Sequence, residues 1–182
     1  GGTPQVWNTC MVFFQLVLLA GYAYTHTVST RLKLRQQLIV HGAVLFLPML
    51  MLFAFPIYET VKLWDPPTEG NPIPETLKLL AIVIGIPFFV VSTSAPLLQR
   101  WFAYSGDPSA QDPYFLYGAS NLGSLLSLLL YPALFEPMTF LSQQTLIWAV
   151  GYIALAAFVL YCAYTIFKVA PADSSLATEA AA

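Results

Sequence analysis

Charged side chains are scarce in this chain of 182 residues. Only 9% of the residues are Asp, Glu, Lys or Arg, and 58% are hydrophobic, whereas typical soluble domains carry roughly 25% charged residues. The net charge of −2 lacks the basic excess with which nucleic-acid-binding proteins meet phosphate groups. The apolar excess also argues against disorder. The composition therefore predicts an integral membrane protein that lies in the lipid bilayer and does not bind nucleic acid.

Motifs of catalysis and metal binding are missing as well. The sequence has two cysteines and two histidines, and no HExxH, CxxC or P-loop pattern. No charged residue lies near the centre of a long apolar segment, although proton relays and ion-coupled pumps need such residues at membrane depth. We therefore expect no catalytic residue and no metal site in this chain.

Five continuous apolar stretches are each long enough to cross a membrane, which takes about 20 helical residues. Their continuous pattern excludes the alternating strands of a barrel. The sequence predicts an all-α, polytopic membrane protein with five transmembrane helices in residues 1–170, followed by a disordered tail at 171–182. The expected helices are Val6–Tyr24, Leu38–Ile57, Leu77–Ala95, Tyr114–Leu134 and Thr145–Phe167.

Basic residues fall mostly on one side of this predicted topology. Five of the seven Lys and Arg residues lie in the first and third connections between the predicted helices or just after the last helix, which are all on the same side of the membrane. Basic residues favour the cytoplasmic side. We therefore expect the N-terminus outside and the C-terminus in the cytoplasm. The five basic residues are Arg31, Lys33, Arg35, Arg100 and Lys168.

A short helix is predicted at Pro96–Tyr104, after the third apolar stretch, because proline is favoured in a first helical turn. Trp101 belongs to its apolar face, while Gln99 and Arg100 lie outside that face. We expect this helix to lie in the cytoplasmic headgroup region, with Trp101 as an interfacial anchor.

Small and polar residues in two stretches point to contacts with other helices. Ala119, Gly123 and Ser127 recur at a spacing of four, which lets helix backbones approach closely in lipid. A packing face is favoured here over a ligand site. Asn121 and Gln15 carry amides that need hydrogen-bond partners within hydrocarbon. We expect Gln15 to pack against a further helix.

The two histidines lie at the facing ends of the first two stretches. His26 and His41 would approach each other there, and two imidazoles on neighbouring helices can be the axial ligands of a haem. The favoured alternative is that each histidine bonds a backbone carbonyl or a lipid headgroup. We therefore expect no cofactor, and a haem or pigment is the alternative to test.

Several segments resemble bacterial proteins known as fused major-facilitator-like/spermidine-synthase-like proteins. Members usually have one more helix before the Gly-Gly and a synthase-like cytoplasmic domain after the membrane part; the sequence shows neither, so the synthase chemistry is not carried over. The resemblance implies a bacterial inner-membrane module whose stretch Gln99–Asn121 contacts a cytoplasmic partner or domain. The similar segments are Gly1–Cys10, Phe13–Gln15, Leu19–His26, Pro87–Phe89, Ser94–Phe102 and Asp112–Ser124.

Three functions are compatible with the sequence. The favoured one is a non-catalytic membrane subunit or scaffold that packs against other helices of a larger assembly. The second is half of a small-solute transporter, for a polyamine for instance, although no buried carboxylate is available to meet a cation. The third is a subunit that holds a haem or pigment with His26 and His41.

Overall fold

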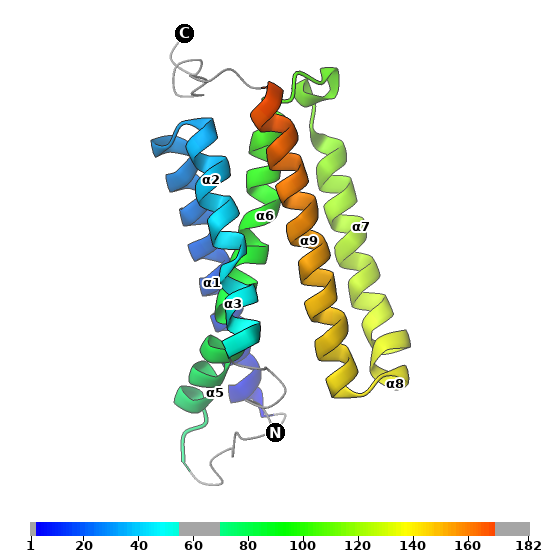
Figure 1. Ribbon diagram of the computed structural model, residues 1–182. Coiled ribbons are helices and arrows are strands. Elements are labelled where there is room, and N and C mark those ends of the chain that lie inside the picture. The colour runs from blue at the N-terminus through cyan, green and yellow to red at the C-terminus, as the bar shows by residue number, and fades with distance from the viewer. Residues whose placement is uncertain (1–2, 55–69, 170–182) are drawn as a thin grey trace.

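The computed structural model describes residues 3–54 and 70–169 of the chain. Every element within these residues is a helix (Figure 1), so the predicted all-α fold is confirmed for this part of the chain. The predicted tail at 171–182 lies outside the described residues. The α-helices are α1 (Pro4–Arg31), α2 (Leu34–Leu45), α3 (Leu47–Ala54), α5 (Ile73–Leu80), α6 (Ile86–Phe102), α7 (Tyr114–Leu130), α8 (Glu136–Met138) and α9 (Leu141–Val169).

Five helices within the described residues are long and apolar enough to span a membrane, as the sequence predicts. Each extends past its predicted apolar stretch at one end or both, because polar end residues continue the helix beyond the apolar run. α1, for example, begins at Pro4, where the Thr3 hydroxyl accepts a hydrogen bond from the Val6 N–H. The five are Pro4–Arg31, Leu34–Met51, Ile73–Phe102, Tyr114–Met138 and Leu141–Val169.

Two π-helical turns interrupt the third and fourth of these helices, at Ala81–Gly85 and Tyr131–Phe135. Each turn ends just before a proline, Pro87 or Pro137. Proline has no N–H and cannot bond the carbonyl four residues earlier. The backbone hydrogen bonds therefore change there from the α-helical to the π-helical spacing of five residues. Both helices nevertheless continue past the irregular turn.

The predicted short helix at Pro96–Tyr104 is not a separate element. α6 continues through Pro96 without a break, and Trp101 is only 1% exposed. The Trp101 Nε1 donates a hydrogen bond to Gln37 Oε1 at 3.3 Å, and Gln37 Nε2 donates to the Leu32 carbonyl oxygen at 2.9 Å. The prediction of an interfacial helix is wrong because its apolar face packs against α2 and α9.

The buried core lies between α2, α6 and α9. Val90, Leu97 and Val159 are fully buried there. At the break between α2 and α3, the Tyr152 hydroxyl of α9 donates a hydrogen bond of 2.7 Å to the Leu45 carbonyl oxygen. Apolar packing and a few buried hydrogen bonds thus hold these three helices together.

α1 and α6 approach each other closely at Gly21. A Cβ atom added to Gly21 would lie 2.2 Å from Ser92 Oγ and 3.3 Å from Ser92 Cβ. The Ser92 hydroxyl is itself bonded to the Phe89 carbonyl oxygen at 2.7 Å. The absence of a side chain at Gly21 is therefore what lets these two helices meet.

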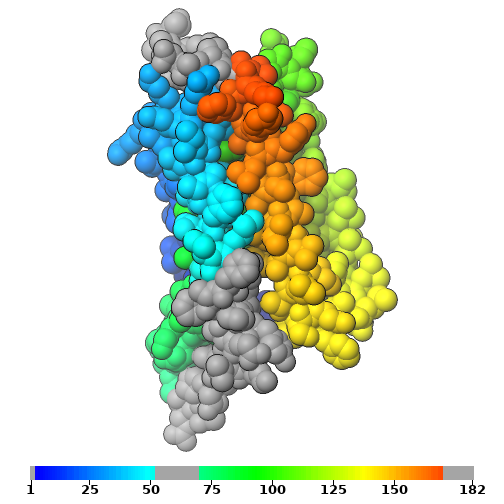
Figure 2. All heavy atoms as spheres, in the orientation of Figure 1, coloured from blue at the N-terminus to red at the C-terminus, as the bar shows by residue number. Residues whose placement is uncertain are grey.

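α7 differs from the other long helices because none of its residues is buried. It lies beside α9, to which it is joined through α8 at one end of the molecule (Figure 1). Figure 2 shows α2, α3 and α9 forming one continuous face, with the hairpin of α7 and α8 emerging at the edge of α9. The bundle of α1, α2, α6 and α9 is thus packed without help from α7.

One end of the molecule collects the five basic residues on which the predicted topology depends. The end of α1, the start of α2, the end of α6 and the end of α9 all lie at that end (Figure 1). Lys78 and Glu75 belong to α5, at the opposite end. The fold therefore places these five basic residues at one end of the molecule, as the sequence predicts. This holds whichever way the chain is oriented in a membrane.

Candidate functional site

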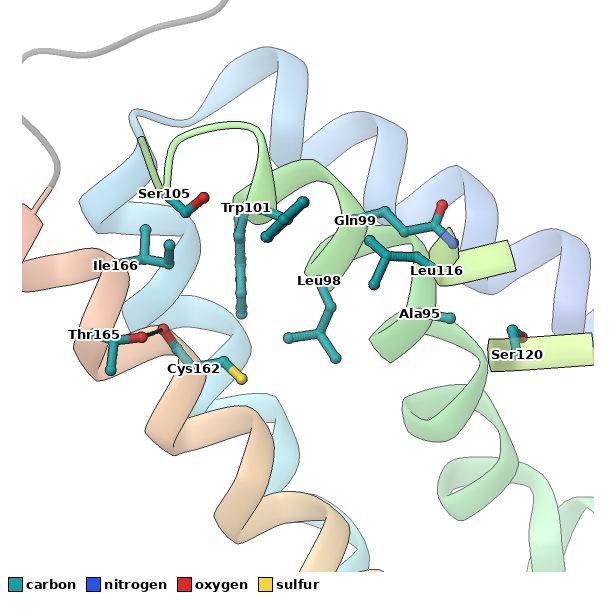
Figure 3. A pocket seen from close by; sticks show the side chains of 11 residues that line it. Ala95, Leu98, Gln99, Trp101, Ser105, Leu116, Ser120, Cys162, Thr165 and Ile166 are labelled. Atoms are coloured by element: carbon teal, nitrogen blue, oxygen red, sulfur yellow. Dashed lines mark hydrogen bonds between the residues drawn. The ribbon is translucent and has the colours of Figure 1, made fainter. Parts of the chain in front are cut away.

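A hollow of about 400 Å³ opens between the end of α6, the start of α7 and the end of α9 (Figure 3). Trp101 and Leu98 reach from α6 toward α9, where they face Cys162 and Thr165. The hollow exists because α7 does not close against the other two helices. Its lining residues are Ala95, Leu98, Gln99, Trp101, Phe102, Ser105, Leu116, Ser120, Cys162, Thr165 and Ile166.

The chemistry of this lining is mainly apolar. The lining contains no Asp, Glu, Lys, Arg or His. The Thr165 hydroxyl donates to the Cys162 carbonyl oxygen at 2.8 Å, so it is already satisfied within α9. Gln99, Ser105 and Ser120 are the remaining polar side chains. Such a surface suits apolar groups with one or two hydrogen-bonding atoms. Cys162, a free cysteine, also belongs to the lining.

A second hollow, of about 230 Å³, lies near the other end of α7. Both π-helical turns border it, since Val83 and Ile84 belong to the first and Tyr131 to the second. The Tyr131 hydroxyl donates to Gln144 Oε1 at 3.2 Å across this space. Its other lining residues, Thr145 and Trp148, come from α9.

The same face of α7 looks into both hollows. Ser120 lines the first and Tyr131 lines the second, and residues at i, i+3, i+7 and i+11 lie on one side of a helix. Gly123 and Ser127 occupy the two positions between them. A Cβ atom added to Gly123 would meet no atom within 4 Å. The small residues of α7 thus face the bundle across open space.

The other predicted residues of α7 fall on different sides of the helix. Ala119 is close to the face that carries Gly123 and Ser127, since positions four apart share a side. Asn121 lies about 160° around the helix from Gly123, given 3.6 residues per turn. It is exposed, and no partner for its amide is found among the described residues. Its predicted hydrogen bond to another helix stays a prediction.

Gln15 lies on the exposed side of α1, away from the contact with α6. Met11 and Leu19, one turn before and after it, are 61% and 64% exposed. Within the described part of the chain the Gln15 amide makes no hydrogen bond. Its predicted contact with a further helix is therefore neither confirmed nor contradicted.

The two histidines occupy different environments. His26 is exposed, whereas His41 is 0% exposed and lies beside Tyr24 and Trp101, with ring-centroid distances of 6.1 and 5.7 Å. Neither ring nitrogen of His41 has a hydrogen-bond partner among the described residues. Neither of the two hollows described above is lined by His41. Haem or pigment binding by His26 and His41 therefore stays a prediction.

The stretch around Trp101 is the part of the predicted site that the structure brings together. Gln99 and Trp101 both line the larger hollow, but Arg100 does not. Arg100 is half-buried, and its Nε has no partner in the described structure. Sequence reasoning missed Leu116 and Thr165, since their place in the lining depends on where α7 and α9 lie relative to α6.

Comparisons with known proteins give no further identification. No protein-family model, curated protein or solved structure matches this chain. Over the residues that the structure describes, no group of three or more His, Cys, Asp or Glu residues is placed to hold a metal ion. The resemblance to fused major-facilitator-like/spermidine-synthase-like proteins therefore stays a prediction from the sequence.

Proposed function

We propose that this chain is a non-catalytic membrane module whose five long helices cross a bilayer and pack against further helices of a larger assembly. The observation that carries the proposal is the face of α7 with Ser120, Gly123 and Ser127, which lies between two hollows and touches nothing at Gly123. We infer that a further helix occupies this face in the membrane.

The chemistry of this face favours a helix over lipid. The Ser124 hydroxyl bonds the Ser120 carbonyl oxygen at 3.0 Å, and the Ser127 hydroxyl bonds the Gly123 carbonyl oxygen at 2.9 Å, so neither hydroxyl needs an outside partner. Because the side chains of this face are small, another helix can approach the backbone of α7 closely there. Packing between backbones drives helix association in lipid, where the hydrophobic effect gives no preference.

A small-solute transporter is the second candidate function. The larger hollow, at about 400 Å³, falls in the size range of small-molecule pockets. A cationic substrate such as a polyamine would meet no carboxylate in its lining. Accumulation of a solute in liposomes by the purified chain alone would favour this function over the first.

We further propose a bacterial inner membrane, with the N-terminus outside and the C-terminus in the cytoplasm. The gathering of Arg31, Lys33, Arg35, Arg100 and Lys168 at one end supports this orientation. In a Lys33→Cys variant whose free Cys10 and Cys162 are replaced by serine, an impermeant thiol reagent should label the chain only after the cell membrane is permeabilised. Labelling in intact cells would reverse the orientation.

The packing proposal is tested by two substitutions in α7. Gly118 and Gly123 both have no atom within 4 Å of an added Cβ, but they lie about 140° apart around the helix. If a helix covers Gly123, a Gly123→Phe variant should recover about tenfold less partner in mild detergent, since overpacking costs roughly 1–3 kcal/mol. A Gly118→Phe variant should recover as much as the unmodified chain. Equal recovery with both variants would contradict the proposal.

A further inference from the structure

Two cations lie over neighbouring aromatic rings where α2 begins and α9 ends. The Arg35 Cζ is 4.8 Å from the centre of the Phe167 ring, and the Lys168 Nζ is 4.5 Å from the centre of the Tyr164 ring. Tyr164 and Phe167 are three residues apart, so their side chains are neighbours on the surface of α9. The two positive groups are therefore held at one corner of the bundle.

The positive charge at this corner has no described counter-charge. The Arg35 Nε is buried and has no hydrogen-bond partner, and no ion pair with a carboxylate involves Arg35 or Lys168 among the described residues. Contact with an aromatic face orients a cation but does not neutralise it. An anion placed here would meet two cations that are already positioned.

The surface that runs from these cations along α2 and α9 is apolar. Arg35, Ile39 and Gly42 share one face of α2, at i, i+4 and i+7, and Ile39 is 65% exposed. Phe46, the residue that follows α2, is 50% exposed. A Cβ atom added to Gly42 would lie 3.6 Å from the Leu160 Cδ2 of α9, so the two helices touch where α2 has no side chain. Figure 2 shows these two helices side by side.

We propose that this corner binds the phosphate of an anionic phospholipid, with an acyl chain lying along the surface of Ile39, Gly42 and Phe46. The inference rests on the proposed membrane location. Basic pockets at the ends of membrane helices recognise anionic headgroups, and aromatic residues favour the same interfacial depth. The combination of two positioned cations with an exposed apolar surface fits a lipid better than an acidic peptide, because a peptide would leave that surface uncovered.

The test uses the purified full chain in mild detergent and native mass spectrometry with phosphatidylglycerol or phosphatidylcholine. The Arg35→Gln/Lys168→Gln variant should bind phosphatidylglycerol roughly 30-fold more weakly, because each basic residue near a membrane surface contributes about 1 kcal/mol. The Arg31→Gln/Lys78→Gln variant removes the same total charge elsewhere and should bind as the unmodified chain does. Inorganic phosphate at the same concentration should not displace the lipid.

Three outcomes would overturn the lipid site. These are equal weakening in both double variants, equal binding of the two lipids by the unmodified chain, and displacement by inorganic phosphate. Thermal unfolding of each variant in detergent checks that the fold is retained, and Lys168→Gln alone should still weaken binding about fivefold. The two proposals on which this inference could fail are tested separately. If the chain does not reside in a membrane, it should stay dispersed without detergent. If no helix packs on α7, the Gly123→Phe variant should recover as much partner as the unmodified chain.

Discussion

The contact between α1 and α6 and the face of α7 are built from similar residues but are packed in opposite ways. Gly21 of α1 lies so close to α6 that an added Cβ would be 2.2 Å from Ser92 Oγ, whereas an added Cβ at Gly123 of α7 would meet nothing within 4 Å. Small residues permit close approach between helices. At Gly21 the closely packed partner is α6 of the same chain, whereas at Gly123 no helix of the described structure fills that place.

Glutamine side chains show the same difference. Gln37 is 2% exposed and bonds both Trp101 and the Leu32 carbonyl, so its amide is satisfied inside the bundle. Gln15 is exposed on the outer side of α1 and has no described partner. The Gln37 amide is therefore satisfied by groups of the packed bundle, while the Gln15 amide is left to the surroundings of α1.

The largest expected effect is in the packed region, at Trp101. The Trp101→Ala variant should lose about 3–5 kcal/mol of unfolding free energy, because a fully buried indole is removed, and Gln37 loses its donor partner. Leu128, which is 72% exposed on α7, gives the matched control, since Leu128→Ala should change the stability of the isolated chain little. Thermal unfolding in detergent measures both, and comparable losses would mean that α7 packs against the bundle.

A smaller effect is expected at the contact between α1 and α6. The Gly21→Ala variant should be destabilised by about 1–3 kcal/mol, because the added methyl group forces Ser92 or the helix backbones to move. Gly118→Ala should be neutral or stabilised by up to about 1 kcal/mol, since alanine is the better helix former. If Gly21→Ala unfolds at the same temperature as Gly118→Ala, the two helices are not in close contact.

The smallest effect is expected at Gln15. A Gln15→Leu variant should keep the stability of the isolated chain but weaken association with a further helix by about 0.6 kcal/mol, the average for such hydrogen bonds in membranes. Partner recovery in mild detergent, compared with a Leu19→Ile variant on the same side of α1, measures the difference. Unchanged recovery would remove Gln15 from the proposed contacts.

Sequence patterns predicted the helices well because apolar length is a local property. The five long helices follow from runs of about 20 apolar residues, and the gathering of basic residues follows from their alternation. The surroundings of Trp101 were mispredicted because an apolar helix face looks the same whether lipid or another helix covers it. Leu116 and Thr165 were missed, since a hollow between three helices depends on the distances between those helices in space.

The central claim is that a helix covers the Gly123 face of α7 in the membrane, and photo-crosslinking tests it most directly. A benzophenone amino acid would replace Leu130, which lies seven residues after Gly123 on the same side of α7, and separately Leu128, which lies about 140° around the helix from Gly123 and is 72% exposed. After activation in native membranes, we predict a discrete protein adduct from position 130 and mainly lipid adducts from position 128. Lipid adducts alone from position 130, at the level seen from position 128, would contradict the claim.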